Sequence, residues 1–110
     1  MQVTTPEIDA DQLADAVRLG AAIVDVREPH EYLAGHVPGA ALMPMSQVPH
    51  RIHEIDRRGP VYVVCATGSR SATTTDYLRS AGFDAYSVAG GTSEWTRSGR
   101  PVVAGHAPRA

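Results

Sequence analysis

The chain has 110 residues, 43% hydrophobic and 20% charged, which suits one compact domain and is too short for two. With 10 basic and 12 acidic residues the net charge is −2, so the composition lacks the basic excess of nucleic-acid-binding domains. No apolar run reaches the ~18–20 residues of a membrane span. The first residues lack signal-peptide features, and a single cysteine excludes an internal disulfide, so we expect a cytoplasmic protein.

Helices and strands alternate along the chain. Apolar residues at helical spacing after Asp9 predict a first helix that ends at Gly20. Pro29 suits the first turn of a short second helix, and apolar positions within 46–55, with Pro49 near the start, predict an amphipathic third. Further helices are predicted over 71–81 and from a plain Gly90-Gly91 turn to about Gly99, and strands over 21–26, 40–43, 61–64 and 84–88.

This alternation predicts a three-layer α/β domain with helices on both faces of a mainly parallel sheet. The domain is expected to occupy residues 1–103. Residues 104–110 have no core-forming pattern and are expected to be a flexible tail. In such sheets, ligands bind beyond the carboxyl ends of the strands, and strand 61–64 ends at the only cysteine.

That cysteine opens a short polar loop, Cys65-Ala66-Thr67-Gly68-Ser69-Arg70. A free cysteine is often a core residue, but core packing does not require the glycine, serine and arginine that follow this one. Gly68 permits a positive φ, which lets successive N–H groups point inward as an anion-binding nest. The following helix adds the positive end of its dipole. The pattern therefore predicts that Cys65 is an activated nucleophile rather than a packing residue.

Three charged residues are candidates to support the loop. Asp25 and Arg27 come near the end of a neighbouring strand, where a structural ion pair with nearby acidic residues is the favoured role. Arg70 has two open interpretations. It orients an anionic donor, or it folds back onto a carboxylate such as Asp25 and braces the loop.

The histidines and aromatic residues favour packing roles. His36 is predicted to be a turn residue that packs against the domain rather than a general base. His50 and His53 share a predicted helix without a third ligand, which predicts a solvated face and no metal site. Tyr77 and Trp95 are predicted to be core anchors.

The loop pattern Cys65-x-x-Gly68-x-Arg70 resembles the active-site loop of the rhodanese family of sulfurtransferases. Two further stretches resemble family signatures in the same order: Asp25-Val26-Arg27-Glu28 through Tyr32 with Gly35 to Ala40, and Gly90-Gly91 with Trp95, Gly99, Pro101 and Val102. The resemblance runs from about residue 5 to residue 103. It implies a five-stranded sheet with helices on both faces.

The resemblance also implies a chemistry. The Cys65 thiolate would attack the outer sulfur of a small anionic donor of the thiosulfate or mercaptopyruvate type, and the resulting persulfide would pass to cyanide, a thiol or a protein. Because there is no second cysteine, the acceptor must be external. No cofactor, metal, nucleic acid or membrane is expected. The implied site comprises catalytic Cys65, substrate-binding Ala66, Thr67, Gly68, Ser69 and Arg70, and supporting Asp25 and Arg27.

Two other functions stay open beside this one. Protein phosphatases of the same fold place five residues between cysteine and arginine; four intervene here, which favours sulfur transfer over a phosphatase or arsenate reductase. A sulfur carrier or interaction module with little turnover is the other alternative.

Ala66 and Thr67 are neutral where thiosulfate-specialised relatives tend to carry basic residues, so the loop looks more like that of mercaptopyruvate-using relatives.

Overall fold

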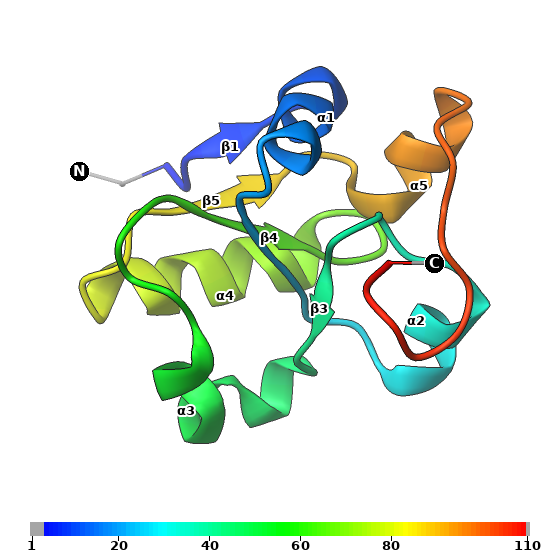
Figure 1. Cartoon of the computed structure of the whole chain (residues 1–110). Coiled ribbons are helices and arrows are strands. Elements are labelled where there is room, and N and C mark those ends of the chain that lie inside the picture. The colour runs from blue at the N-terminus through cyan, green and yellow to red at the C-terminus, as the bar shows by residue number, and fades with distance from the viewer. Residues whose placement is uncertain (1–3, 110) are drawn as a thin grey trace.

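Five short strands form one sheet whose spatial order differs from their order in the chain (Figure 1). The computed structural model describes residues 4–109. Every strand pairing in that range is parallel, and the order is β1-β5-β4-β2-β3. The carboxyl ends of all the strands therefore lie at the same edge of the sheet. The bounds are β1 Glu7–Ile8, β2 Ala22–Asp25, β3 Ala41–Leu42, β4 Val61–Val64 and β5 Ala85–Val88.

Helices cover both faces of this sheet, which confirms the predicted three-layer α/β architecture (Figure 1). α1 and α5 lie on one face and α3 and α4 on the other, whereas α2 lies beyond the carboxyl end of the strands. Within residues 4–109, no helix combines the length and the hydropathy that crossing a membrane requires. The bounds are α1 Ala10–Arg18, α2 Pro29–Ala34, α3 Val48–Arg51, α4 Ser69–Ser80 and α5 Gly91–Arg97.

The hydrophobic core is divided by the sheet into two clusters. Val63 packs with Leu78 of α4 in one cluster, and the next residue, Val64, packs with Trp95 of α5 in the other. This alternation follows from the two-residue period of a strand. Cys65 continues it and belongs to the cluster on the α4 side, so the strand itself aims the thiol toward the first turn of that helix.

The amphipathic helix predicted over 46–55 is instead three short segments. The 3₁₀ turns Met45–Gln47 and Ile52–Glu54 flank α3, which is only four residues long. Pro49 lies in the first turn of α3 because it has no N–H to donate to a preceding turn. The apolar positions are nevertheless the expected ones, since Val48 and Ile55 are buried.

Strand β1 was not predicted from the residues, because two residues are too few to show an alternating pattern. It is fixed by pairing with β5: Ser87 N–H donates to the Pro6 carbonyl and Ala89 N–H donates to the Ile8 carbonyl, both at 2.9 Å. These contacts supply the fifth strand that the family resemblance implied.

The prediction that Tyr77 anchors the core was wrong, whereas Trp95 is buried as expected. Tyr77 is 41% exposed because α4 turns a different stripe toward the sheet. The buried residues of that stripe are Ser71, Thr74, Thr75 and Leu78. A small-residue, partly polar stripe of this kind does not stand out by hydrophobicity, which is why the face was misassigned.

The segment after residue 103 is attached to the domain at its backbone. Gly105 N–H donates to the Leu33 carbonyl and Gly39 N–H donates to the Pro108 carbonyl, both at 3.0 Å. The flexibility expected for residues 104–110 stays a prediction. These hydrogen bonds place the described part of the segment along the end of α2 and the turn after it (Figure 1).

Tyr32 offers a direct test of how α2 is held against the turn that follows it. Its hydroxyl donates to the Ala40 carbonyl at 2.6 Å, and the residue is buried. We expect Tyr32→Phe to lower the free energy of unfolding by about 1–2 kcal/mol, because the Ala40 carbonyl loses its buried partner. Tyr77→Phe, at an exposed tyrosine, should change it little. Urea denaturation of both variants measures the difference, and equal losses would contradict this account.

Candidate active site

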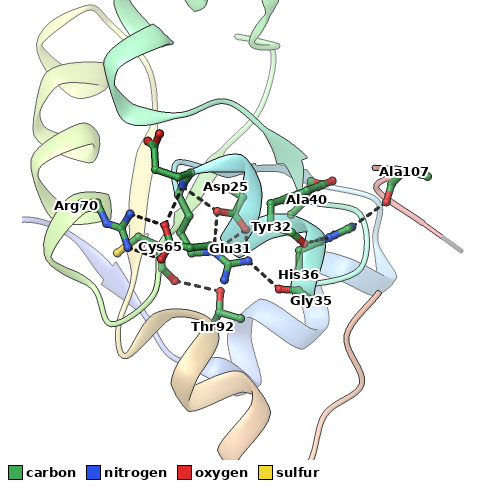
Figure 2. A network of polar contacts seen from close by, with 12 residues as sticks. Asp25, Glu31, Tyr32, Gly35, His36, Ala40, Cys65, Arg70, Thr92 and Ala107 are labelled. Atoms are coloured by element: carbon green, nitrogen blue, oxygen red, sulfur yellow. Dashed lines mark hydrogen bonds and ion pairs between the residues drawn. The ribbon is translucent and has the colours of Figure 1, made fainter. Parts of the chain in front are cut away.

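Cys65 lies directly after β4, at the carboxyl edge of the sheet, beside Arg70 and Glu31 (Figure 2). It is only 1% exposed. Its sulfur is not surrounded by aliphatic groups alone: Gly68 N–H donates to Sγ at 3.1 Å, and Ser71 Oγ lies 3.4 Å from Sγ. The thiol of this core residue therefore faces hydrogen-bonding groups as well as apolar neighbours.

The start of α5 fixes the backbone of the loop. The Cys65 carbonyl accepts from Thr92 N–H at 2.8 Å and from the Thr92 hydroxyl at 3.0 Å, and the Ala66 carbonyl accepts from Ser93 N–H at 3.0 Å. In a trans peptide the C=O and N–H bonds point in opposite directions. Because both carbonyls point to α5, the N–H groups of Ala66 and Thr67 point away from it, toward the inside of the loop.

Gly91 makes this close approach possible. A Cβ atom at this position would lie 2.4 Å from the Cys65 carbonyl oxygen and 2.7 Å from the Ala66 carbonyl oxygen, which is sterically forbidden. The Gly90-Gly91 pair is therefore more than the plain turn that we predicted. It brings the first turn of α5 against the loop that carries the thiol.

Helix α4 begins at Ser69, two residues before the predicted start at 71. Gly68 occupies the position before it with φ +117°, a left-handed conformation that favours glycine. Ser69, Arg70 and Ser71 therefore belong to the first turn of the helix, whose N–H groups have no partners within the helix. The predicted loop is in fact a three-residue turn followed by a helix N-terminus.

Two opposing effects act on the thiol of Cys65. Burial is the larger single effect and raises its pKa, whereas the Ser71 hydroxyl and the backbone amides of Ser71, Gly68 and Thr67 lower it. Together the hydrogen bonds outweigh burial, so the pKa of Cys65 lies below its ordinary value. This arrangement favours a thiolate, the form in which cysteine acts as a nucleophile.

Ser71 is a site residue that sequence reasoning missed, since only Thr67 and Ser69 were considered as hydroxyl donors. It is fully buried, and its Oγ lies 3.1 Å from the Gly68 carbonyl and 2.8 Å from Ser87 Oγ. A hydroxyl has one proton and two lone pairs. When Cys65 is ionised, Ser71 can donate to the sulfur while Ser87 donates to Ser71. The available signal was a serine on the buried side of α4, one turn after Gly68.

Asp25 and Arg27 form a buried ion pair with each other. Arg27 donates from Nε to Asp25 Oδ1 at 3.0 Å and from Nη2 to Oδ2 at 2.9 Å, and its backbone N–H donates to Oδ1 at 3.0 Å. Arg27 Nη2 also donates to the Gly35 carbonyl at 2.8 Å. The pair therefore ties the end of β2 to the end of α2, next to the loop (Figure 2).

Arg70 does fold back onto a carboxylate, but the carboxylate is Glu31 of α2 rather than Asp25. The two side chains form a bidentate pair, Nη1 to Oε1 at 2.8 Å and Nη2 to Oε2 at 2.9 Å (Figure 2). Hydrogen bonds from Arg70 are the main reason that the pKa of Glu31 falls to about 2. The pKa of Arg70 rises, first through Glu31 and then through the negative charges of Cys65 and Asp25.

His36 is occupied by backbone groups. Its ring is fully buried, with Nδ1 2.9 Å from the Tyr32 carbonyl oxygen and Nε2 2.8 Å from the Ala107 carbonyl oxygen. The imidazole stacks on the Tyr32 ring at a centroid distance of 3.6 Å. Both nitrogens are engaged in packing the turn, in agreement with the packing role expected from the sequence.

Comparison with known proteins places these features in a family. Residues 9–98 match the family described as Rhodanese-like domain. A sulfurtransferase of Allochromatium vinosum is 35% identical over 101 residues, which cover 89% of this chain and 94% of that protein.

Two solved structures are similar over most of the chain. A rhodanese-like domain protein of Staphylococcus aureus has a TM-score of 0.81 and 33% identity, over 91% of this chain and 98% of that one. A thiosulfate sulfurtransferase of Pseudomonas aeruginosa has a TM-score of 0.85 and 30% identity; the match covers 96% of this chain and 21% of that larger chain.

The role of Ser71 can be tested by alkylation of the only cysteine. Ser71→Ala removes a group that lowers the pKa of Cys65, so the pKa should rise and the iodoacetamide rate at neutral pH should fall about threefold or more. Ser80→Ala, at an exposed position of the same helix, is the control and should leave the rate unchanged. An unchanged rate–pH profile in Ser71→Ala would show that the hydroxyl does not act on the sulfur.

The contact between α5 and the loop can be tested at two glycines of that helix region. Gly91 and Gly99 both have positive φ, but a Cβ at Gly99 meets no atom within 4 Å. We expect Gly99→Ala to cost about 1 kcal/mol of unfolding free energy from backbone strain alone. Gly91→Ala should cost about 1–3 kcal/mol more from the clash with the loop carbonyls and should slow alkylation of Cys65. Equal effects of the two changes would contradict the proposed contact.

Proposed function

The chain belongs to the rhodanese-like family, and from that premise we propose that it is a sulfurtransferase in which Cys65 carries sulfur as a persulfide. The observation that carries the proposal is the hydrogen-bonded environment of a single buried thiol: the Gly68 amide at 3.1 Å and the Ser71 hydroxyl at 3.4 Å. The same groups that stabilise a thiolate can stabilise the terminal sulfur of a persulfide anion.

The first half-reaction is a nucleophilic displacement at sulfur. The Cys65 thiolate attacks the outer sulfur of the donor, and an S–S bond forms as the donor's bond to that sulfur breaks. With thiosulfate the leaving group is sulfite, which departs with the bonding electron pair. With mercaptopyruvate the leaving group is the enolate of pyruvate, whose carbon then takes up the proton that the donor's thiol gives up. Cys65 retains the sulfur as a persulfide anion.

The second half-reaction returns the thiolate. An external nucleophile attacks the terminal sulfur, the Cys65 S–S bond breaks, and the electron pair returns to Cys65 Sγ. Cyanide would leave as thiocyanate, and a thiol would leave as a new persulfide. Because Cys65 is the only cysteine in the sequence, no second thiol of this chain can accept the sulfur. A thiol or protein acceptor in a reducing compartment such as the cytoplasm fits this chemistry.

The dimensions of the loop support sulfur as the bound group. Only three residues separate Cys65 from the start of α4, and four separate it from Arg70. The Gly68 amide already reaches Sγ within this small ring. A single sulfur atom adds one anionic centre to such a ring, whereas a tetrahedral phosphoryl group needs room for three further oxygens.

Intact-mass analysis tests the proposal. After incubation with thiosulfate or mercaptopyruvate and removal of the donor, the chain should gain the mass of one sulfur atom, and cyanide should remove it. Cys65→Ser should gain no sulfur, because a hydroxyl is a poor nucleophile at neutral pH.

Two outcomes would contradict the proposal. One is a sulfur adduct of equal yield in Cys65→Ser. The other is hydrolysis of an aryl phosphate by the wild-type chain in the absence of any sulfur adduct.

A further inference from the structure

The sequence leaves the identity of the sulfur donor open, and the charges around Arg70 bear on it. Arg70, in the first turn of α4, is the only cationic residue from Cys65 to the end of that turn. An anionic donor that reaches Cys65 would be attracted by this guanidinium if it were free. In the structure it is not free, because both of its terminal nitrogens donate to Glu31.

Glu31 is held in place independently of Arg70. It lies in the first turn of α2, where its Oε1 also accepts from Glu28 N–H at 2.9 Å and completes a capping box. The carboxylate is therefore anchored by the helix to which it belongs. Because the pKa of Glu31 is about 2, it is ionised at every pH at which the thiol works.

The second ion pair at this edge of the sheet, Asp25–Arg27, also has no net charge, because one carboxylate matches one guanidinium. Arg27 Nε and Nη2 donate to Asp25, and Nη2 also donates to the Gly35 carbonyl, so this guanidinium is engaged by a carboxylate as well. The two arginines that the structure places beside the loop are thus each matched by one carboxylate. The neutral residues Ala66, Thr67 and Ser69 add no positive charge.

We propose that Glu31 is a positioning residue that sets donor specificity: it occupies and neutralises Arg70, and thereby makes the site select weakly charged sulfur donors over the thiosulfate dianion. This inference rests on the proposed sulfur-transfer function. A dianion either approaches a neutralised site or must displace Glu31 from Arg70. A monoanionic donor loses about half as much electrostatic attraction, and a neutral one loses none.

Alkylation of the only thiol measures this field without any sulfur donor. Iodoacetate is an anion and iodoacetamide is neutral, and both react with the same thiolate. The ratio of their rates therefore cancels any change in the pKa of Cys65 and reports the local charge.

Glu31→Gln keeps the size of the side chain and an oxygen acceptor for Glu28 and Arg70, but removes the charge. The iodoacetate-to-iodoacetamide ratio should rise about twofold to fivefold at low ionic strength, and less at high salt.

Glu54→Gln is the matched control. Glu54 also forms a bidentate pair with an arginine, Arg51, at 3.0 Å. It lines a pocket with Ala21 and Ala22 at the start of β2, whereas the Cys65 loop follows the carboxyl ends of the strands. The substitution changes the net charge of the chain by the same amount, so it should leave the ratio at its wild-type value.

Arg70→Gln distinguishes electrostatics from simple bracing of the loop. It leaves Glu31 without its cation, so the ratio should fall below the wild-type value. A purely structural role would move the Glu31→Gln and Arg70→Gln ratios in the same direction, which would overturn the inference. An unchanged ratio in Glu31→Gln would overturn it as well. If one variant fails to fold, the ratio of the other still shows whether it changes in the predicted direction.

The donor itself is tested last. In Glu31→Gln the second-order rate of persulfide formation from thiosulfate should rise about threefold or more relative to that from mercaptopyruvate. An unchanged preference between these donors would overturn the proposed selection. Failure of the wild-type chain to take sulfur from either donor would instead overturn the proposed function, whereas the alkylation ratios test the effect of Glu31 on the local charge without any sulfur transfer.

Discussion

The first turn of α5 donates three hydrogen bonds to two carbonyls of the Cys65 loop, and the rest of the site depends on this contact. Thr92 and Ser93 turn the Cys65 and Ala66 carbonyls outward, and peptide planarity then turns the next amides inward. Gly91 permits the close approach. A backbone held in this way presents amides to the sulfur before any substrate binds, so no reorganisation is needed when negative charge develops.

The sheet and the charged residues serve this arrangement in different ways. Strand β4 directs Cys65 toward the α4 side of the sheet, where Gly68 and Ser71 can reach its sulfur. The Asp25–Arg27 and Glu31–Arg70 pairs tie β2, α2 and α4 together around the loop (Figure 2). Their charges cancel, so the anion is stabilised mainly by nearby amides and a hydroxyl rather than by a net positive field. Such short-range stabilisation suits a small sulfur anion.

The sequence predicted what depends on local pattern and missed what depends on distant partners. β4, the cysteine at its end and the need for Gly68 follow from an apolar run, a strand end and a turn residue. Glu31 as the partner of Arg70 did not, because 39 residues separate them and Asp25 was an equally plausible carboxylate. Ser71 was missed because a buried hydroxyl on a weakly amphipathic helix resembles a surface serine. Pro49 was interpreted as tolerable near the start of one helix, whereas the segment forms a short α-helix flanked by two 3₁₀ turns.

The most direct test of this account is the ionisation of Cys65 in the wild-type chain, followed by the ultraviolet absorbance of its thiolate as the pH is raised. With a single thiol in the sequence, the low-pH step belongs to Cys65 alone. We expect a midpoint clearly below the ordinary cysteine value of about 8.5. A midpoint at or above that value would mean that burial prevails over the surrounding donors, and the anion-stabilising site described above would be contradicted.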